Sequence, residues 1–341
     1  MHTEPASLRD AALAYGLRLA APPRPVSERV WRLLADQGEF AFKLYGSDQR
    51  SRADKEATVL AHLQQAGAAP AAAYAGPRSP RQDTAAGYRV QTLVRTRDGA
   101  PLWQGSTGCG LMTLWDPGRY QRYDSYTATQ WAALGASLAA LHQRLDTLAV
   151  PGIETLHGRL RALDAEQLGE QWSADSRRDD APMLREHADT CLRILDACLP
   201  RSLAGYPLDD PQRPIHNDYN QFNYLFGATL PPLILDWEAA IGAPREYELV
   251  RCLNHLPLES PDLARAFVSA YLRVRALRPE RLAWAVDTAC LQHALKRWLV
   301  ERWLHDRARH AESLHGAHHM AALLLAGRTR LVAFYTDCLQ A

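Results

Sequence analysis

One segment in the second half of the chain concentrates polar side chains that could bind a cation. Asp218 and Asn223 precede a short apolar run, and Asp236 follows a second one. The two runs, 224–226 and 233–235, predict a hairpin that brings the three side chains together. Carboxylate and carboxamide oxygens are ligands that Mg²⁺ prefers, usually with substrate phosphates completing its shell. Single Asp and Asn residues in loops usually only close local turns, but this joint arrangement favours a metal–nucleotide site.

A second set of residues lies near the N-terminus. Strand alternation over 40–45 places Ala41 and Lys43 on one face, where the small alanine leaves room for a flat ligand such as adenine. Glu56 lies on the apolar stripe of a helix predicted over 51–66, where a carboxylate needs a cationic partner such as Lys43. The alternative is that Lys43 extends into solvent. The downstream cluster favours the pair, because a Lys–Glu pair with metal ligands is recurrent in phosphoryl transfer.

The composition excludes several other classes of function. The 341 residues include 39 Lys and Arg against 38 Asp and Glu, so the chain lacks the basic field that nucleic-acid binding requires. Six scattered cysteines without a C-x-x-C pair predict reduced core thiols. The polar start of the chain and the lack of a long apolar run predict a cytoplasmic protein without a secretory signal or membrane span.

The elements that would position these residues predict an α+β fold with two lobes, divided in the turn 115–118. The first lobe, 1–115, is expected to hold an antiparallel sheet and a helix, and the second, 116–341, to be mainly helical with a catalytic hairpin. Predicted strands cover 29–35, 39–45, 88–95 and 110–115, and turns cover 36–38 and 108–110. Predicted helices cover 51–66, 181–198, 282–306 and a segment beginning after Thr127 or Thr129. Loops are predicted over the alanine-rich 66–75, over 202–213 and around His310, His315, His318 and His319.

The order of these motifs resembles the small-molecule branch of the protein-kinase-like fold. This branch includes aminoglycoside phosphotransferases, choline and ethanolamine kinases and type II homoserine kinases. The resemblance runs from Val26 to Leu253 and rests on Phe-Ala-Phe-Lys ending at Lys43, Glu56, His216-Asn217-Asp218 with Asn223, and Leu235-Asp236-Trp237-Glu238. Glu248 stands where the family usually has an Asp. No G-x-G-x-x-G motif is present, and Ser27 and Glu28 occupy the tip position instead.

The resemblance implies ATP and Mg²⁺ as cofactors and a small-molecule hydroxyl as the phosphate acceptor. Asp218 matches the catalytic base, and Asn223 and Asp236 match the metal ligands. The nucleotide site would include Lys43 with its partner Glu56, the tip residue Ser27, Ala41, and the hinge residues Thr113 and Trp115.

Several points stay open at this stage. His216 is expected to support the loop, whereas Glu238 could attract an amine of the acceptor or cap the following turn. The acceptor and the oligomeric state are not encoded in a motif. A protein Ser/Thr kinase and a catalytically silent nucleotide-binding protein are the alternatives; against the first, no Ala-Pro-Glu-like segment follows Asp236.

Overall fold

The computed structural model describes residues 7–65, 87–106 and 108–340, so the alanine-rich segment 66–75 lies outside the described residues. The chain forms two compact units. The first comprises Met1–Tyr126, Ala136–Ile153 and His216–Ala240, and the second comprises Thr127–Gly135, Glu154–Ile215 and Ile241–Ala341. The chain therefore passes between the units several times, whereas the expected division has a single boundary at 115/116.

The first unit contains an antiparallel sheet in the order β1-β2-β3-β7-β5, with β6 also paired to β7. Its strands are β1 (Arg24–Pro25), β2 (Val30–Ala35), β3 (Gly38–Gly46), β5 (Leu93–Val94), β6 (Trp103–Gly105) and β7 (Gly108–Leu114). Ala35 pairs with Gly38, so Asp36 and Gln37 form a two-residue turn and the predicted hairpin is confirmed. The predicted turn over 108–110 is wrong, because these residues begin β7.

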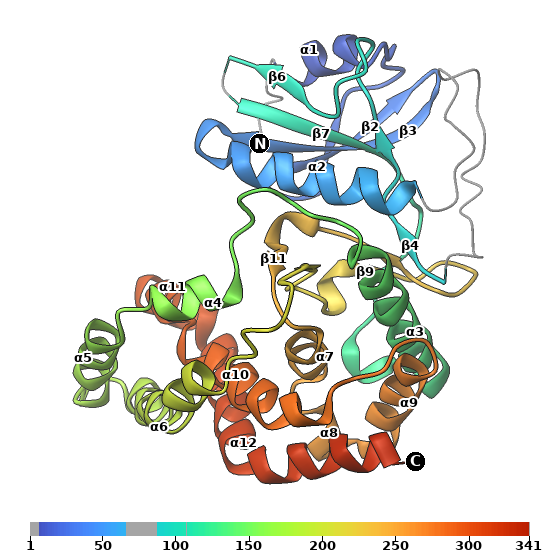
Figure 1. Ribbon diagram of the computed structural model, residues 1–341. Helices are drawn as coiled ribbons and strands as arrows, with labels where there is room; N and C mark the ends of the chain where they lie inside the picture. The colour runs from blue at the N-terminus through green and yellow to red at the C-terminus, as the bar shows by residue number, and fades with distance from the viewer. Residues whose placement is uncertain (1–6, 66–86, 107, 341) are drawn as a thin grey trace. The chain divides into compact units, whose positions relative to one another are not determined.

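Two helices accompany this sheet, α1 (Ser7–Ala14) and α2 (Arg50–Gln64). Phe40 and Phe42 of β3 join Leu8 of α1 in one buried apolar cluster, as expected from strand alternation. α2 runs alongside β3 and β7 (Figure 1). Its buried residues recur at helical spacing and include Glu56 and Leu60. The helix therefore directs one carboxylate into the interior.

A second small sheet in the first unit carries the hairpin expected from the sequence. β9 (Tyr224–Leu225) and β10 (Leu233–Ile234) are antiparallel, and β4 (Arg89–Val90) pairs in parallel with β10. Short 3₁₀ turns precede β9 at Gln221–Asn223 and follow β10 at Trp237–Ala239. The predicted strand over 88–95 is therefore split between two sheets, and Gln91 lies in the gap.

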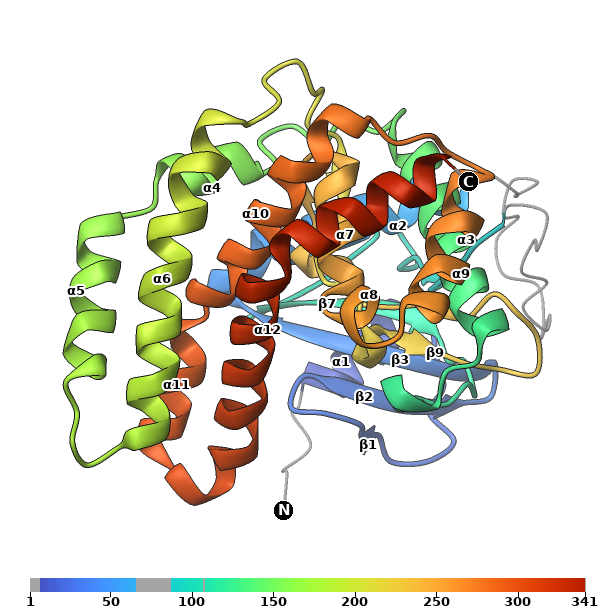
Figure 2. The ribbon, with the colours of Figure 1, turned by 90° about the horizontal axis from the view of Figure 1, so that it is seen from below.

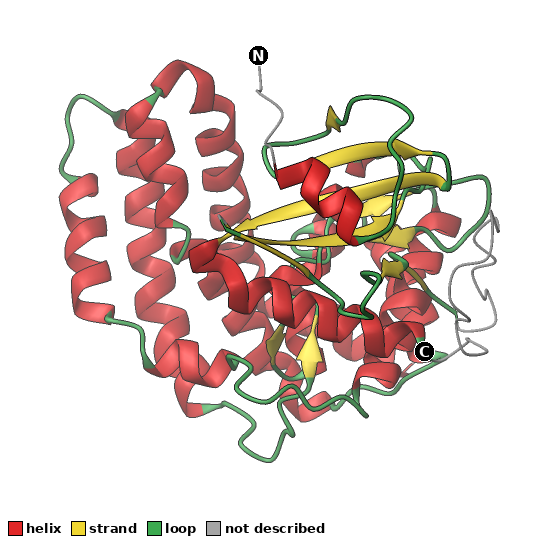
Figure 3. Cartoon of the chain, turned by 90° about the horizontal axis from the view of Figure 1, so that it is seen from above, coloured by secondary structure: helices red, strands yellow, loops and turns green. Residues whose placement is uncertain are grey.

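The second unit is mainly helical. Its helices are α4 (Leu156–Arg161), α5 (Ala165–Ser176), α6 (Pro182–Ala204), α7 (Arg245–Leu253), α8 (Leu256–Glu259), α9 (Pro261–Leu272), α10 (Leu282–Ala294), α11 (Arg297–His305) and α12 (Arg307–Gln340). The strands β8 (Pro214–Ile215) and β11 (Ile241–Gly242) pair with each other. Helices α5, α6, α11 and α12 lie side by side (Figure 2), and Figure 3 shows how helices dominate this unit while longer strands belong to the first. The expected α+β class is thus confirmed.

Three predictions for the helical unit differ from the structure. α6 continues to Ala204, so the expected loop over 202–213 begins three residues late. The predicted helix over 282–306 is interrupted at 295–296, between α10 and α11. The loop expected around the C-terminal histidines is wrong: they lie on α12, whose buried Leu314, Ala321 and Leu324 follow a helical stripe.

Helix α3 (Ala128–Leu145) contains residues of both units and begins where the sequence predicted. Thr127, rather than Thr129, caps it, because the Thr127 hydroxyl accepts a hydrogen bond from the Gln130 backbone N–H at 3.2 Å. No described helix has both the length and the apolar character needed to cross a membrane.

Gly110 provides a test of the packing in the first unit. It pairs with Leu44 in the sheet, and an added Cβ would lie 2.0 Å from Phe42 Cζ. We expect Gly110→Ala to lower the free energy of unfolding by about 1–3 kcal/mol, since the ring must shift in a close-packed core. Chemical denaturation monitored by circular dichroism measures the change.

The matched control is Gly169→Ala in α5, where an added Cβ would meet no atom within 4 Å. It should leave stability unchanged or raise it by up to about 1 kcal/mol, because alanine favours the helix. Equal effects of both substitutions would contradict the packing described for Phe42.

Candidate active site

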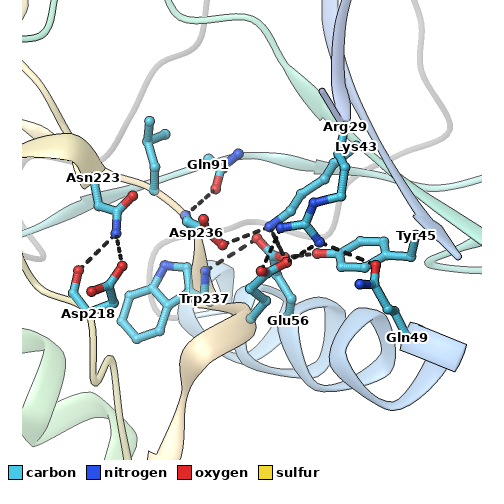
Figure 4. Close-up of polar contacts among 12 residues, drawn as sticks. Arg29, Lys43, Tyr45, Gln49, Glu56, Gln91, Asp218, Asn223, Asp236 and Trp237 are labelled. Carbon is cyan, nitrogen blue, oxygen red and sulfur yellow. Dashed lines mark hydrogen bonds and ion pairs between the residues drawn. The ribbon is translucent and has the colours of Figure 1, made fainter. Parts of the chain in front are cut away.

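Lys43 on β3 lies among three carboxylates, one from α2 and two from the segment after β10. Figure 4 shows Lys43 beside Glu56 and Asp236. Its ammonium nitrogen is 2.9 Å from Glu56 Oε2, 2.7 Å from Asp236 Oδ1 and 2.9 Å from Glu238 Oε2. Burial alone would lower the pKa of Lys43, but the three carboxylates outweigh it and raise that pKa. The predicted pairing of Lys43 with Glu56 is confirmed.

Glu56 on α2 is fully buried, and each of its oxygens is occupied. Oε2 accepts hydrogen bonds from Lys43 and from the Tyr45 hydroxyl, and Oε1 accepts one from the Trp237 backbone N–H at 3.3 Å. Burial and the neighbouring Glu56 raise the pKa of Tyr45, so its hydroxyl stays protonated and donates. These bonds satisfy a carboxylate that would otherwise be costly to bury. They also fix α2 relative to β3 and to the segment after Asp236.

Glu238 lies between two cations. Arg29 Nη2 donates to Glu238 Oε1 at 2.8 Å and Nη1 donates to Oε2 at 3.2 Å, while Lys43 contacts Oε2. Burial would raise the pKa of Glu238, but its bonds and charge contacts with Arg29 and Lys43 prevail and lower it to about 2. The carboxylate is therefore ionised near neutral pH. Acceptor binding by Glu238 stays a prediction, and in this structure both oxygens already have cationic partners.

His216 connects the two ends of the hairpin. Its Nδ1 accepts the Asp218 backbone N–H at 3.2 Å, and its Nε2 lies 2.7 Å from the Leu235 carbonyl oxygen. These partners fit a neutral imidazole that carries its proton on Nε2. The ring also lies 4.5 Å from the Trp237 ring. This geometry fits the supporting role expected for His216.

Asp218 and Asn223 are held together by a short network. Asn223 Nδ2 donates to the Asp218 backbone oxygen at 2.8 Å and to Asp218 Oδ2 at 2.9 Å. Asn220 Nδ2 donates to Asp218 Oδ1 at 2.7 Å. Because the Asn223 amide nitrogen faces Asp218 (Figure 4), its amide oxygen faces away and can serve as a cation ligand. The Asn223 carbonyl also accepts the Leu235 N–H at 2.9 Å, which brings Asn223 beside the residue preceding Asp236.

The backbone at Asp236 and Asn217 adopts the left-handed conformation, with φ of 62° at both residues. Asn and Asp tolerate this region better than most side chains. The Asp236 N–H donates to Gln91 Oε1 at 3.2 Å, and the Asn217 side chain donates to the Ala239 carbonyl at 3.0 Å. The turn out of β10 is thereby fixed, and the Asp236 carboxylate is directed at Lys43.

The donor set suits a hard divalent cation. One oxygen each of Glu56, Asp236 and Glu238 lies within 4.8 Å of the others, and the Lys43 ammonium group is the cation that contacts all three. The Asp236 carboxylate and the Asn223 amide oxygen belong to strand ends joined by the bond from the Leu235 N–H to the Asn223 carbonyl, and both are ligands of the kind that Mg²⁺ prefers. The residues present therefore fit the metal that the sequence predicted.

The other residues expected to contact the nucleotide lie on the sheet and its connections. Ala41 on β3 and Thr113 on β7 are direct partners in the register. The Ser27 N–H donates to the Val30 carbonyl at 3.2 Å in the turn before β2. The Trp115 N–H donates to the Glu39 backbone carbonyl at 3.0 Å. Their contacts with a nucleotide stay predictions.

Three residues of the site make contacts that the sequence did not predict. Tyr45 could have been found, because it follows Lys43 by two residues and strand alternation places it on the same face. Arg29 opens the strand predicted over 29–35 but precedes β2 in the structure, and Gln91 lies within the strand predicted over 88–95. Neither carries a sequence signal for its contact with a residue more than a hundred positions away.

Comparisons with known proteins agree with this geometry. The phosphotransferase enzyme family matches residues 19–284. Spectinomycin phosphotransferase, solved with ADP and spectinomycin, has a TM-score of 0.68 at 12% identity, covering 95% of this chain and 99% of that one. Amicoumacin kinase, solved with AMP-PNP and Ca²⁺, has a TM-score of 0.62 at 15% identity, covering 92% of each chain. A microcompartment-associated aminopropanol kinase has a TM-score of 0.61 at 18% identity, covering 98% of this chain and 99% of that one.

No curated protein matches the sequence significantly. At these identities the structural likenesses establish the fold alone, and they agree with the expected small-molecule kinase fold. The family match covers most of the chain. The chain belongs to the phosphotransferase enzyme family and is a phosphotransferase.

Proposed function

We propose that the chain transfers the γ-phosphoryl group of ATP to a hydroxyl of a small, amine-bearing molecule, with Mg²⁺ as the metal. The observation that carries the proposal is the position of Lys43, which holds Glu56 at 2.9 Å and Asp236 at 2.7 Å. A lysine fixed by a helix carboxylate beside a metal-type aspartate is the arrangement that phosphoryl transfer uses to bind and align a triphosphate.

The residues divide the work of binding and alignment. Lys43 would bind the α- and β-phosphate oxygens while Glu56 keeps its ammonium group in place. Asn223 and Asp236 would hold the metal, which when bound neutralises phosphate charge and polarises the transferring group. Charge neutralisation and alignment by fixed groups supply most of the rate in this chemistry.

Asp218 would orient the acceptor hydroxyl and take its proton. Its carboxylate is held by Asn223 and Asn220 through bonds of 2.9 and 2.7 Å. Each carboxylate oxygen retains a further lone pair for an acceptor hydroxyl. A base held in this way typically contributes roughly 10²–10⁴-fold to the rate.

The class of acceptor rests on the structural neighbours rather than on Glu238. The neighbours act on spectinomycin, amicoumacin and aminopropanol, as their names state. An amine on the acceptor is consistent with two of the family branches that the sequence resembles, the aminoglycoside and amino-alcohol kinases. Glu238 adds no support, because Arg29 and Lys43 occupy its oxygens.

An acceptor screen tests the proposed reaction. We expect ³¹P NMR of Mg-ATP with the protein and a panel of amino alcohols, aminoglycosides, amino acids and sugars to show ADP and a new phosphomonoester signal with at least one amine-bearing alcohol. Casein-type proteins serve as the control acceptors. Phosphorylation of casein alone would favour a protein kinase, and binding of Mg-ATP without transfer to any acceptor would favour a silent nucleotide-binding protein.

Asp218→Asn tests the proton-accepting role once an acceptor is found. The substitution removes the basic carboxylate while keeping its size, so kcat should fall by roughly 10²–10⁴-fold with the Mg-ATP dissociation constant nearly unchanged. Steady-state kinetics and calorimetry measure the two quantities. The matched control is Asp54→Asn, which alters an exposed carboxylate paired with Arg50 on α2. Retention of most activity by Asp218→Asn would contradict the assignment.

A further inference from the structure

Arg29 is a second cation at the carboxylate cluster of Glu56, Asp236 and Glu238, and Figure 4 shows it beside Lys43. It immediately precedes β2, and its guanidinium binds both oxygens of Glu238, at 2.8 and 3.2 Å. Nη1 also lies 3.4 Å from Gln49 Oε1. A guanidinium that grips a carboxylate with two parallel N–H groups can grip two phosphate oxygens in the same way. Arg29 therefore has the chemistry of a phosphate ligand.

The formal charges of the cluster favour such a role. Lys43 and Arg29 supply two positive charges against three negative carboxylates. The cluster as described is therefore negative by one charge, and the phosphates of a nucleotide bound at Lys43 would add to that excess. A second cation turned towards the phosphates reduces the repulsion between them and the carboxylates.

The structure also allows Arg29 to leave Glu238 without isolating a buried charge. Lys43 Nζ lies 2.9 Å from Glu238 Oε2 in this structure, so the carboxylate has a second cationic partner besides Arg29. The Arg29 side chain is 37% exposed and that of Glu238 is 13% exposed. The more exposed partner can therefore turn away while the more buried one stays paired.

We propose that Arg29 is a phosphate-binding residue that exchanges Glu238 for phosphate oxygens of the bound nucleotide. The inference rests on the proposed function, because it assumes that a nucleotide binds at Lys43. It differs from a static role, in which the Arg29–Glu238 pair only fastens the connection before β2 to the segment after Asp236. If Arg29 binds phosphate, replacing Glu238 should increase the contribution of Arg29 to ATP affinity. If the pair is static, replacing Glu238 should remove that contribution.

A double-mutant cycle distinguishes them, with ATP affinity measured by calorimetry in EDTA so that no metal competes for Glu238. We expect Arg29→Met to weaken ATP binding by roughly tenfold and to leave adenosine binding unchanged, since adenosine carries no phosphate. In the Glu238→Gln background Arg29 no longer has to break an ion pair, so Arg29→Met should weaken ATP binding by more than it does in the wild type. Arg29→Lys keeps the positive charge but lacks the two parallel N–H groups. Its ATP affinity should therefore lie between that of the wild type and that of Arg29→Met.

Arg50→Met is the matched control, because it removes an arginine from an ion pair of the same unit that involves Asp54 on the surface of α2. It should leave ATP affinity unchanged. The proposal is overturned if wild-type protein binds ATP and Arg29→Met binds it equally well, or if Arg29→Met has no effect once Glu238 is replaced. If the wild-type protein does not bind ATP, the proposed function fails together with this inference. If the wild-type protein binds ATP but Arg29→Met has no effect, only the role of Arg29 fails.

Discussion

The structure of the site depends on one buried lysine and the three carboxylates around it. Lys43 is 11% exposed and contacts Glu56, Asp236 and Glu238 at 2.7–2.9 Å. Carboxylates this close would repel one another and would be costly to bury without a cation among them. The ammonium group therefore makes the convergence of a strand, a helix and a hairpin end possible, and the same group is suited to a triphosphate.

The surrounding elements hold these charges in place. Glu56 binds the Trp237 N–H, and His216 links Asp218 to the carbonyl of Leu235, so the metal-type aspartate and the proposed base are parts of one hydrogen-bonded hairpin. The left-handed backbone at Asp236 turns its carboxylate towards Lys43. Such fixed orientation is what electrostatic catalysis requires, because the groups then need little reorganisation during the reaction.

The sequence predicted the parts of the site that follow a regular period. Alternation along β3 placed Lys43, and the helical stripe of α2 placed Glu56, so their pairing could be inferred before any coordinates. The Arg29–Glu238 pair joins residues 209 positions apart, and only the folded chain brings them together. The same limit explains the breaks at 91–92 and 295–296, where tertiary contacts override a continuous local pattern. The loop predicted around the histidines of α12 followed from their own irregular spacing, whereas the apolar residues Leu314, Ala321 and Leu324 of the same segment keep a helical period.

A crystal structure of the protein with Mg²⁺ and a non-hydrolysable ATP analogue would test the central claim most directly. The account predicts that Lys43 Nζ contacts an α- or β-phosphate oxygen while still paired with Glu56, and that Asn223 and Asp236 bind the metal. A triphosphate bound away from Lys43, or a metal held without Asn223 and Asp236, would contradict it.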